Sequence, residues 1–227
     1  MKVALITGTS RGVGRATAVA LGACGFRVHM MGRSSAEQRE TERQLNALAV
    51  PFAFEACELT DGKAIEEAAA SLLELHGAPE VVVHNAGVVK RAPLSSMTDE
   101  VWQHQLDVNL TAPFRLTRAL LPAMLDAGRG RFLFVSSISA VVGSRHQAAY
   151  NASKAGLVAL MRCLAEELSG TGLMTAAVLP GAIDTDMLHG SGYAPQMSAD
   201  EVARTLAFLA TDASVAHNGG ITEMFGI

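Results

Sequence analysis

Residues 1 to 14 read Met1-Lys2-Val3-Ala4-Leu5-Ile6-Thr7-Gly8-Thr9-Ser10-Arg11-Gly12-Val13-Gly14, a short apolar run that leads into a glycine-rich turn. Val3 to Ile6 has the length and composition of a buried strand, and a segment of helical period from Gly12 to Ala23 follows the turn. Glycines at such a junction permit a tight turn and let a phosphate approach the backbone, while the helix N-terminus offers free N–H groups and a positive dipole end. Because an ordinary strand-to-helix connection can also be rich in glycine, the motif gains its meaning from the rest of the chain.

The same alternation of strand and helix continues along the sequence. Five further apolar runs predict strands at Arg27 to Met31, Phe52 to Ala56, Glu80 to Val83, Arg131 to Val135 and Met174 to Leu179. Helical periods occupy Ala36 to Ala49, Asp61 to His76, Thr98 to Asp107, Leu110 to Ala127, Tyr150 to Ser169 and Ala199 to Thr211. This order predicts an α/β fold, a doubly wound parallel sheet with helices on both faces. A chain of 227 residues, 49% of them apolar, is expected to form one domain.

Charge and composition exclude several classes of function. A net charge of -4 offers no basic field for nucleic acid or an anionic membrane surface. No apolar stretch approaches the roughly 18 residues of a membrane span, and the first apolar run is too short for a signal sequence. Cys24, Cys57 and Cys163 are widely spaced and lack metal-ligand spacing, which predicts reduced, buried thiols and no metal site. We expect a soluble, cytoplasmic protein.

Unusual residues follow the ends of four predicted strands. These are Thr7-Gly8, Asn85-Ala86-Gly87, Ser136-Ser137 and Pro180-Gly181. Ligands of open α/β sheets bind at the edge formed by the carboxyl ends of the strands. The sequence therefore predicts one site assembled from four distant stretches of chain.

The residues after the second predicted strand indicate which dinucleotide such a site would bind. A fold that prefers NAD usually carries an acidic residue there, which holds the ribose 2′-hydroxyl. This chain has Gly32 followed by Arg33. A guanidinium binds a 2′-phosphate bidentately, and Arg11 could reach the same group from the glycine loop. We therefore predict NADP(H) as the cofactor; the alternative is that both arginines are solvated surface charges.

Tyr150 and Lys154 lie four residues apart at the start of a predicted helix, so their side chains share one face. A tyrosine with an ordinary pKa near 10 transfers protons poorly at neutral pH. A nearby ammonium stabilises the phenolate and lowers that pKa, as general acid–base chemistry requires. The alternative is a lysine that extends past a half-buried tyrosine to solvent.

Together these motifs resemble the short-chain dehydrogenase/reductase family, and its 3-oxoacyl reductase-like members in particular, over essentially the whole chain. The matching residues are Thr7 to Gly14, Asn85-Ala86-Gly87, Asn109, Ser137, Tyr150-Asn151-Ala152-Ser153-Lys154, Pro180-Gly181 and Thr185. The resemblance implies a Rossmann-type, seven-stranded sheet ordered 3-2-1-4-5-6-7. It also implies Tyr150 as acid/base and Ser137 as hydrogen-bond donor to the substrate oxygen. Lys154 would additionally bind the nicotinamide ribose, and Asn109 would position a water molecule that links Lys154 to solvent.

The resemblance implies a single domain that holds both the cofactor and a small carbonyl or alcohol substrate. Residues expected at the cofactor are Gly8, Ser10, Arg11, Gly12, Val13, Gly14, Arg33, Glu58, Leu59, Asn85, Ala86, Gly87, Tyr150, Lys154, Pro180, Gly181, Ile183 and Thr185. The implied reaction is hydride transfer between nicotinamide and a carbonyl or secondary alcohol. The alternative is a non-catalytic NADP-binding sensor or scaffold, which would have no need of an acid/base group at Tyr150.

Three features depart from the family pattern or extend it. His84 replaces an Asn, and Glu58 stands where an Asp commonly contacts adenine. The connection from Thr185 to Ser198 is short and carries two glycines and a proline, which predicts no stable helix and an open substrate pocket. The alternative is that Met187, Leu188 and Tyr193 fold down as a compact lid.

The helices Leu110 to Ala127 and Tyr150 to Ser169 carry apolar residues that we expect on more than one face. These are Leu116, Leu120, Met124, Leu157, Leu160, Met161 and Leu164. If one face covers the sheet, a monomer would expose the other. The sequence therefore predicts a homodimer or homotetramer built on these helices, as the family resemblance also implies.

Overall fold

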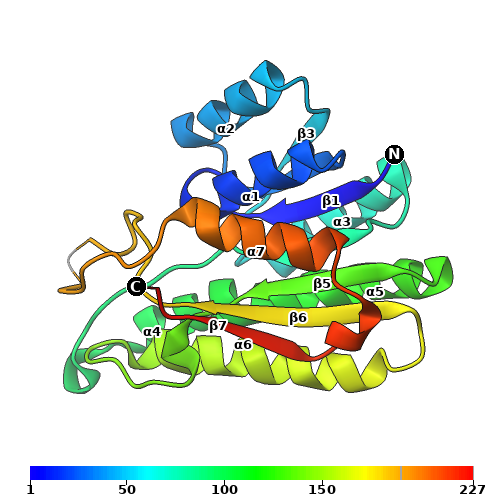
Figure 1. The fold of residues 1–227 in the computed structure, drawn as a ribbon. Helices are drawn as coiled ribbons and strands as arrows, with labels where there is room; N and C mark the ends of the chain where they lie inside the picture. The colour runs from blue at the N-terminus through cyan, green and yellow to red at the C-terminus, as the bar shows by residue number, and fades with distance from the viewer. Residues whose placement is uncertain (190, 227) are drawn as a thin grey trace.

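A computed structural model describes residues 1–189 and 191–226, and seven parallel strands form its central sheet (Figure 1). The strands are β1 (Val3–Thr7), β2 (Arg27–Gly32), β3 (Phe52–Ala56), β4 (Val81–His84), β5 (Gly130–Val135), β6 (Leu173–Pro180) and β7 (Gly220–Met224). Their order across the sheet is β3-β2-β1-β4-β5-β6-β7. The predicted doubly wound fold and strand order are confirmed. The chain order reverses between β1 and β4, and this is where such sheets bind ligands.

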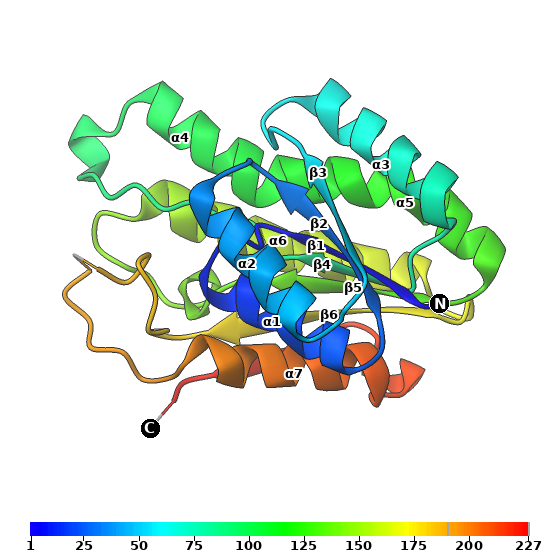
Figure 2. The same cartoon turned by 90° about the horizontal axis from the view of Figure 1, so that it is seen from above.

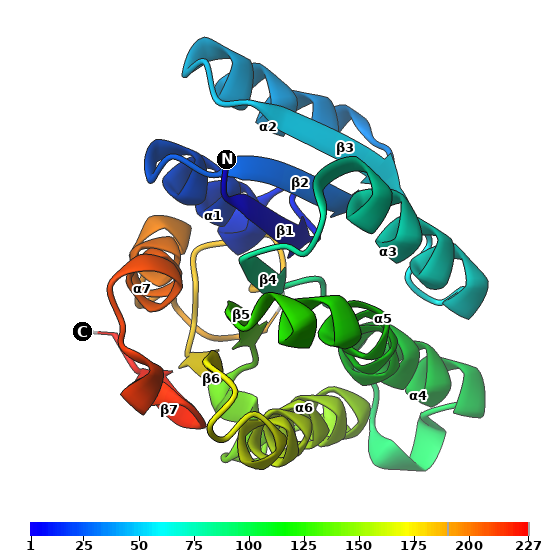
Figure 3. The ribbon, with the colours of Figure 1, turned by 90° about the vertical axis from the view of Figure 1, so that its right-hand side faces the viewer.

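Helices cover both faces of the sheet, as Figure 3 shows from one end. One layer consists of α1 (Gly12–Ala23), α2 (Ala36–Ala47) and α7 (Ala199–Thr211). The other consists of α3 (Gly62–His76), α4 (Asp99–Leu106), α5 (Ala112–Ala127) and α6 (Ala148–Glu167). Among the described helices, none is long and apolar enough to cross a membrane.

Each layer of helices encloses its own hydrophobic core, because successive side chains of a strand point to opposite faces of the sheet. In β1, Ala4 and Ile6 belong to the core under α1 and α7, whereas Leu5 belongs to the core under α3, α5 and α6. All three side chains are fully buried. Burial on both faces fixes the register of the central strands, and with it the position of every loop at their carboxyl ends.

The junction between α4 and α5 differs from the predicted pair of separate helices. The helix continues from α4 through a five-residue π-helical turn, Asp107–Thr111, into α5. Such turns insert one extra residue into a helix and often occur at functional sites. Here the turn carries Asn109, whose side chain is fully buried.

Most apolar residues expected on an outer face of α5 and α6 belong to the core of the chain itself. Leu116, Leu120, Met124, Leu157, Met161 and Leu164 are all buried, and Leu160 is partly buried against the same core. They face the sheet because the helical stripe they form is the one that covers it. These residues therefore do not provide exposed apolar surface for an oligomer.

The three cysteines are free, but only Cys57 is buried, while Cys24 and Cys163 are exposed. The expectation of three buried thiols is therefore wrong for two of them. Burial raises the pKa of the Cys57 thiol to about 11. In the part of the chain that the structure describes, no group of three or more His, Cys, Asp or Glu residues could hold a metal ion.

Candidate active site

The carboxyl ends of β1 and β4 are joined through Asn85. Its side-chain amide donates to the carbonyl oxygens of Thr7 and Gly8, both at 2.9 Å. The Thr7 hydroxyl in turn accepts from the backbone N–H groups of Asn85 (3.1 Å) and Ala86 (3.0 Å). The glycine loop and the Asn85-Ala86-Gly87 stretch therefore form one rigid unit, as their shared sheet edge predicted.

Glycines in this loop stand where no side chain fits. A Cβ on Gly8 (φ +72°) would lie 2.8 Å from the Cα of Ala86, and one on Gly14 would lie 2.1 Å from the carbonyl oxygen of Gly8. A Cβ on Gly12 (φ +53°) would meet the Cγ2 of Thr185 at 3.1 Å, which brings the segment after β6 to the loop. Left-handed backbone and close approach both require glycine at these points.

The N-terminus of α1 has the properties of an anion site. Its N-cap residue, Arg11, makes no side-chain hydrogen bond to the helix, and no acidic residue occupies the first turn. The first N–H groups and the positive dipole end are therefore available to a pyrophosphate. The glycine cradle and this helix end fit a dinucleotide, as the sequence predicted.

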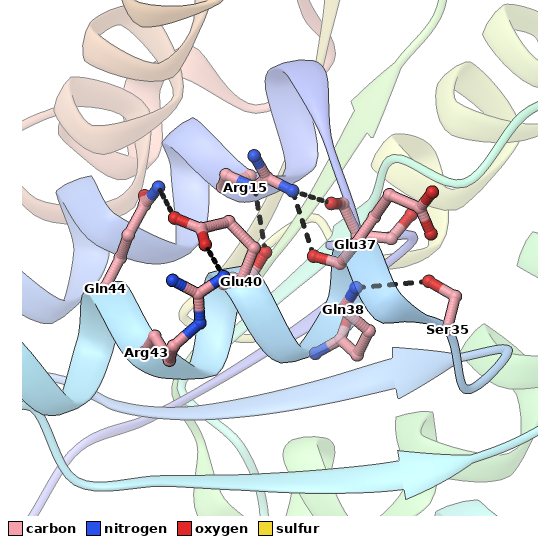
Figure 4. Close-up of polar contacts among 9 residues, drawn as sticks. Arg15, Ser35, Glu37, Gln38, Glu40, Arg43 and Gln44 are labelled. Atoms are coloured by element: carbon pink, nitrogen blue, oxygen red, sulfur yellow. Dashed lines mark hydrogen bonds and ion pairs between the residues drawn. The ribbon is translucent and has the colours of Figure 1, made fainter.

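Arg15, which the sequence analysis did not single out, fixes the glycine loop against α2 (Figure 4). Its guanidinium donates to the Thr41 hydroxyl at 3.0 Å, to the Glu37 carbonyl oxygen at 2.9 Å and to the carbonyl oxygen of Ser10. An arginine one helical turn after Arg11 gave no signal for this role, because its partners on α2, Glu37 and Thr41, lie more than 20 residues away in the chain. Arg15 therefore positions the loop through contacts that only the fold creates.

The two arginines predicted at the 2′-phosphate differ in their surroundings. Arg33 follows β2 and is exposed. Arg11 is also exposed, and its guanidinium forms an ion pair with Asp186 at 2.9 Å. The structure thus leaves Arg33 accessible to solvent and directs Arg11 toward the segment after β6.

Tyr150 and Lys154 lie one turn apart on α6, and both side chains are buried at the same edge of the sheet. The Nζ atom of Lys154 donates to the carbonyl oxygen of Val135 at 2.8 Å and lies 5.8 Å from the centre of the Tyr150 ring. A Cβ on Gly87 would lie 3.4 Å from that Nζ atom and 3.5 Å from Oδ1 of Asn109. The chain after β4, the π-helical turn and α6 therefore meet at Lys154, and the alternative of a lysine that reaches solvent is wrong.

Burial decides the acidity of both groups. It lowers the pKa of Lys154 to about 8, because a buried ammonium loses its hydration. It also raises the pKa of Tyr150, although the Ser137 hydroxyl and the charge of Arg91 act in the opposite direction. The net shift of the Tyr150 pKa is therefore upward, opposite to the direction expected from a nearby ammonium, since the cost of burying a phenolate dominates.

Two further predicted catalytic residues, Ser137 and Asn109, are buried near this pair. Ser137 follows β5 and is buried, with its hydroxyl accepting from the Ser139 N–H at 3.1 Å. Asn109 accepts from the Val88 N–H (2.8 Å) and donates to the Val88 carbonyl oxygen (2.9 Å) and the Ser153 hydroxyl (3.0 Å). Its amide therefore holds the chain after β4 against α6.

Several residues predicted to contact the cofactor are engaged in contacts within the chain. The Glu58 carboxylate accepts from the N–H and hydroxyl of Thr60, both at 3.2 Å. Leu59 and Val13 have their side chains in the two cores. Pro180 ends β6, Gly181 donates from its N–H to the Met224 carbonyl oxygen at 2.8 Å, and Ile183 pairs with Met197.

His84 lies below the site rather than in it. Its Nε2 atom lies 2.8 Å from the Thr117 hydroxyl, and its ring stacks on Phe134 at 4.7 Å between centres. Burial lowers the pKa of His84 to about 3. The histidine in place of the usual Asn is thus a neutral core residue that links β4 to α5.

The described residues of the connection from Thr185 to Ser198 form turns and bends, and no helix, as predicted; Gly190 lies outside them. Met187 and Tyr193 have 40% and 61% of their surface exposed, so they do not fold down as a compact lid. Arg91, from the loop after β4, donates to the Met187 carbonyl oxygen at 3.1 Å. Figures 1 and 2 show the loops after β4 and β6 extending from the same edge of the sheet.

Comparisons with known proteins agree with this geometry. Residues 2–194 match the family model described as short chain dehydrogenase. The chain is 34% identical to the 3-oxoacyl-[acyl-carrier-protein] reductase of Synechocystis sp., across 97% of this chain and 94% of that protein. It is 34% identical to the acetoacetyl-CoA reductase of Rhizobium meliloti, across 96% and 98% of the two chains. A metagenomic short-chain oxidoreductase solved in complex with NADP has a TM-score of 0.85 and 36% identity, and the match covers 99% of this chain and 96% of that one. The motifs, the fold and these matches show that the chain belongs to the short-chain dehydrogenase family.

Proposed function

We propose that this chain is an NADP(H)-dependent oxidoreductase that transfers a hydride between nicotinamide and a carbonyl or secondary alcohol. The observation that carries the proposal is the burial of Tyr150 and Lys154 one helical turn apart, beside the glycine cradle. An acid/base pair next to a dinucleotide site is the arrangement that hydride transfer to a carbonyl requires. One domain supplies both halves of the site.

The cofactor would lie along the carboxyl edge of the strands. The glycine loop and the N-terminus of α1 would hold its pyrophosphate, Arg33 and Arg11 its 2′-phosphate, and Lys154 its nicotinamide ribose. The bound nicotinamide supplies the hydride. Support for NADP(H) over NAD(H) comes from Gly32 and Arg33 after β2, and from the NADP in the structure of the related oxidoreductase.

Proton transfer is the task of this chain's own residues. Ser137 and Tyr150 donate hydrogen bonds to the substrate oxygen and stabilise the negative charge that grows there. Because burial raises the pKa of Tyr150, its hydroxyl keeps the proton until that charge develops and then donates it. The Lys154 ammonium stabilises the phenolate that remains. Asn109 holds the π-helical turn and the chain after β4 beside Lys154.

A carbonyl reductase or alcohol dehydrogenase activity is the function we propose at the finer level. β-Ketoacyl thioesters belong among the trial substrates, because two relatives carry names that specify such compounds. The alternative is a non-catalytic NADP-binding sensor or scaffold, which would bind the same cofactor. The buried Tyr150 and Lys154 favour the enzyme, since a sensor would gain nothing from an acid/base pair that is costly to bury.

The test follows NADPH absorbance with ketones, quinones and β-ketoacyl thioesters. We expect wild-type protein to oxidise NADPH with at least one of them, and Tyr150→Phe to lose roughly 100-fold or more in kcat. NADPH affinity should change only a few-fold, because the phenol contributes little to cofactor binding. Tyr193→Phe, at the chain's other tyrosine, is the matched control and should retain activity. Substantial turnover by folded Tyr150→Phe would show that Tyr150 is not the acid. If wild-type protein binds NADPH but turns over none of these compounds, the result would favour the sensor.

We also propose that the chain forms a homodimer or homotetramer through the outer faces of α5 and α6. Phe114 and Leu125 on α5 are exposed, and Ala152, Ala155 and Ala159 form a stripe of small exposed residues on α6. Small residues allow two helices to approach closely, and exposed aromatic side chains favour association. The expected result is a dimeric or tetrameric mass by light scattering at micromolar concentration, reduced by Ala155→Arg. A monomeric wild-type mass would refute the assembly.

The free thiols of Cys24 and Cys163 are exposed, which fits a reducing compartment such as the cytoplasm.

A further inference from the structure

Arg91 lies in the loop after β4, close to the reacting end of the site. Its positive charge is near enough to Tyr150 to lower the pKa of that hydroxyl. One terminal nitrogen donates to the Met187 carbonyl oxygen at 3.1 Å, at the mouth of the site. The guanidinium therefore stands between the acid/base pair and the segment after β6.

The guanidinium of Arg91 is incompletely satisfied within the chain. Its Nε atom is buried and has no hydrogen-bond partner. Among the described residues, Arg91 also forms no ion pair with an Asp or Glu side chain. A buried, charged donor without a partner costs free energy, so such a group is expected where a ligand completes its hydrogen bonds.

The same rim of the site carries further positive charge. Lys90 and Arg145 are exposed and unpaired in the described structure, and the N–H of Ala92 donates to the His146 carbonyl oxygen at 2.9 Å, which joins the two loops. This local excess contrasts with the net charge of -4 for the chain. Asp186, beside Met187, is already paired with Arg11, so the unpaired positive side chains of this rim are left to attract anionic ligands.

We propose that Arg91 binds an anionic oxygen group of the substrate, a carboxylate attached a few bonds from the reacting carbonyl or alcohol carbon. This inference rests on the proposed function and specifies its substrate class as oxo acids and hydroxy acids. The planar guanidinium fits a carboxylate through its Nε atom and one terminal nitrogen, which are the donors that point in one direction. The terminal nitrogen on that side is Nη2, which also donates to Met187; it carries two N–H groups and can serve both partners.

The first test compares 4-oxopentanoate with its methyl ester, two ketones that differ in one negative charge. Wild-type protein should favour the acid in kcat/KM by roughly 10- to 100-fold. Arg91→Gln should lower the acid-to-ester ratio at least tenfold, and Arg91→Lys should restore part of it, because a lysine keeps the charge without the fork. Arg145→Gln, on the same rim, is the matched control and should lower the ratio much less than Arg91→Gln does, because Arg145 contributes only to the general positive field. A second pair, dihydroxyacetone phosphate and dihydroxyacetone, shows whether the preferred anion is a phosphate instead.

Equal use of acid and ester by wild type would overturn the inference. Equal losses of kcat/KM for the acid and the ester in Arg91→Gln would also overturn it, because the arginine would then serve only to hold Met187. So would an equal effect of Arg145→Gln on the acid-to-ester ratio, because the attraction would then come from a diffuse positive field. A measurement without turnover separates this inference from the proposed function. 4-Oxopentanoate should raise the Tm of the NADPH-loaded protein, its methyl ester should not, and Arg91→Gln should abolish the shift. If the protein turns over neutral ketones but 4-oxopentanoate does not raise its Tm, anion binding by Arg91 is refuted while the proposed oxidoreductase function stands.

Discussion

The guanidinium of Arg11 lies 2.9 Å from the carboxylate of Asp186, so that the glycine loop after β1 is tied to the segment after β6. The two side chains are 64% and 59% exposed. An ion pair so open to water contributes little to stability, about 0 to 1 kcal/mol. Arg11 can therefore exchange Asp186 for a more highly charged partner at low cost.

A 2′-phosphate is such a partner, so NADPH should bind at least about tenfold more tightly than NADH. Arg33→Ala should reduce that preference. Asp186→Asn should increase NADPH affinity by roughly two- to fivefold and leave NADH affinity unchanged, because it removes the competitor for Arg11. Titration of protein fluorescence with each dinucleotide measures all three effects. Equal affinity of wild type for both cofactors would contradict the assignment of Arg33 and Arg11.

Lys154→Met should abolish turnover and yet stabilise the cofactor-free protein at pH 7. Burial lowers the pKa of Lys154 from 10.5 to about 8, which corresponds to a folding cost of roughly 3 kcal/mol for the charged form. Loss of the hydrogen bond to Val135 offsets about 1 kcal/mol of that gain. The net increase in unfolding free energy should therefore be about 1 to 2 kcal/mol.

The pH dependence of this gain follows from the sign of the shift. The folded state binds fewer protons than the unfolded state between pH 8 and 10.5, so the cost is fully present below pH 8 and disappears as the pH rises. The gain from Lys154→Met should shrink over that interval in urea unfolding experiments. Lys90→Met, at an exposed lysine, should show no such trend. A gain that stayed constant up to pH 10 would refute burial as its cause.

His84 should make the protein sensitive to acid. Its pKa falls from 6.5 to about 3 through burial, so the folded state excludes a proton that the unfolded state binds below pH 6.5. Stability should drop by about 1.4 kcal/mol per pH unit from this group as the pH falls below that value. Buried His29, with its pKa lowered to about 4, acts in the same direction.

His84→Asn should therefore flatten the acid limb of the stability curve, whatever it does to stability at pH 7. The measurement is the unfolding free energy between pH 7 and 4.5. His104→Gln, at an exposed histidine of α4, should leave the slope as in wild type. An unchanged slope in His84→Asn would show that other groups control acid unfolding.

The site should accept carbonyl substrates of varied size, since Met187 and Tyr193 leave their side chains in solvent instead of closing over it. A pocket that lacks part of its wall discriminates poorly by bulk. We expect kcat/KM to vary by less than about tenfold across ketones that differ by a ring or a few methylenes, at constant charge. A sharp optimum in such a series would indicate a closed pocket, formed by this segment or by a second subunit.

The sequence by itself determined the alternation of strands and helices, the bounds of α1 and α7, and the edge at which the motifs meet. These follow from local periodicity and from the rule that parallel strands end on one side of the sheet. It did not reveal β7 through its own pattern, because Gly220–Met224 carries Thr222 and Glu223 and becomes a strand by pairing with β6. Only the family resemblance implied that strand.

The tertiary structure decided the electrostatics of the site. Tyr150 and Lys154 are adjacent by sequence, but the direction of their pKa shifts depends on burial by β5, the π-helical turn and the chain after β4. Arg11 meets Asp186, and Arg91 meets Met187, across more than 90 residues of chain. Desolvation and charge pairing are sums over neighbours that are distant in sequence, so they exist only once the chain has folded.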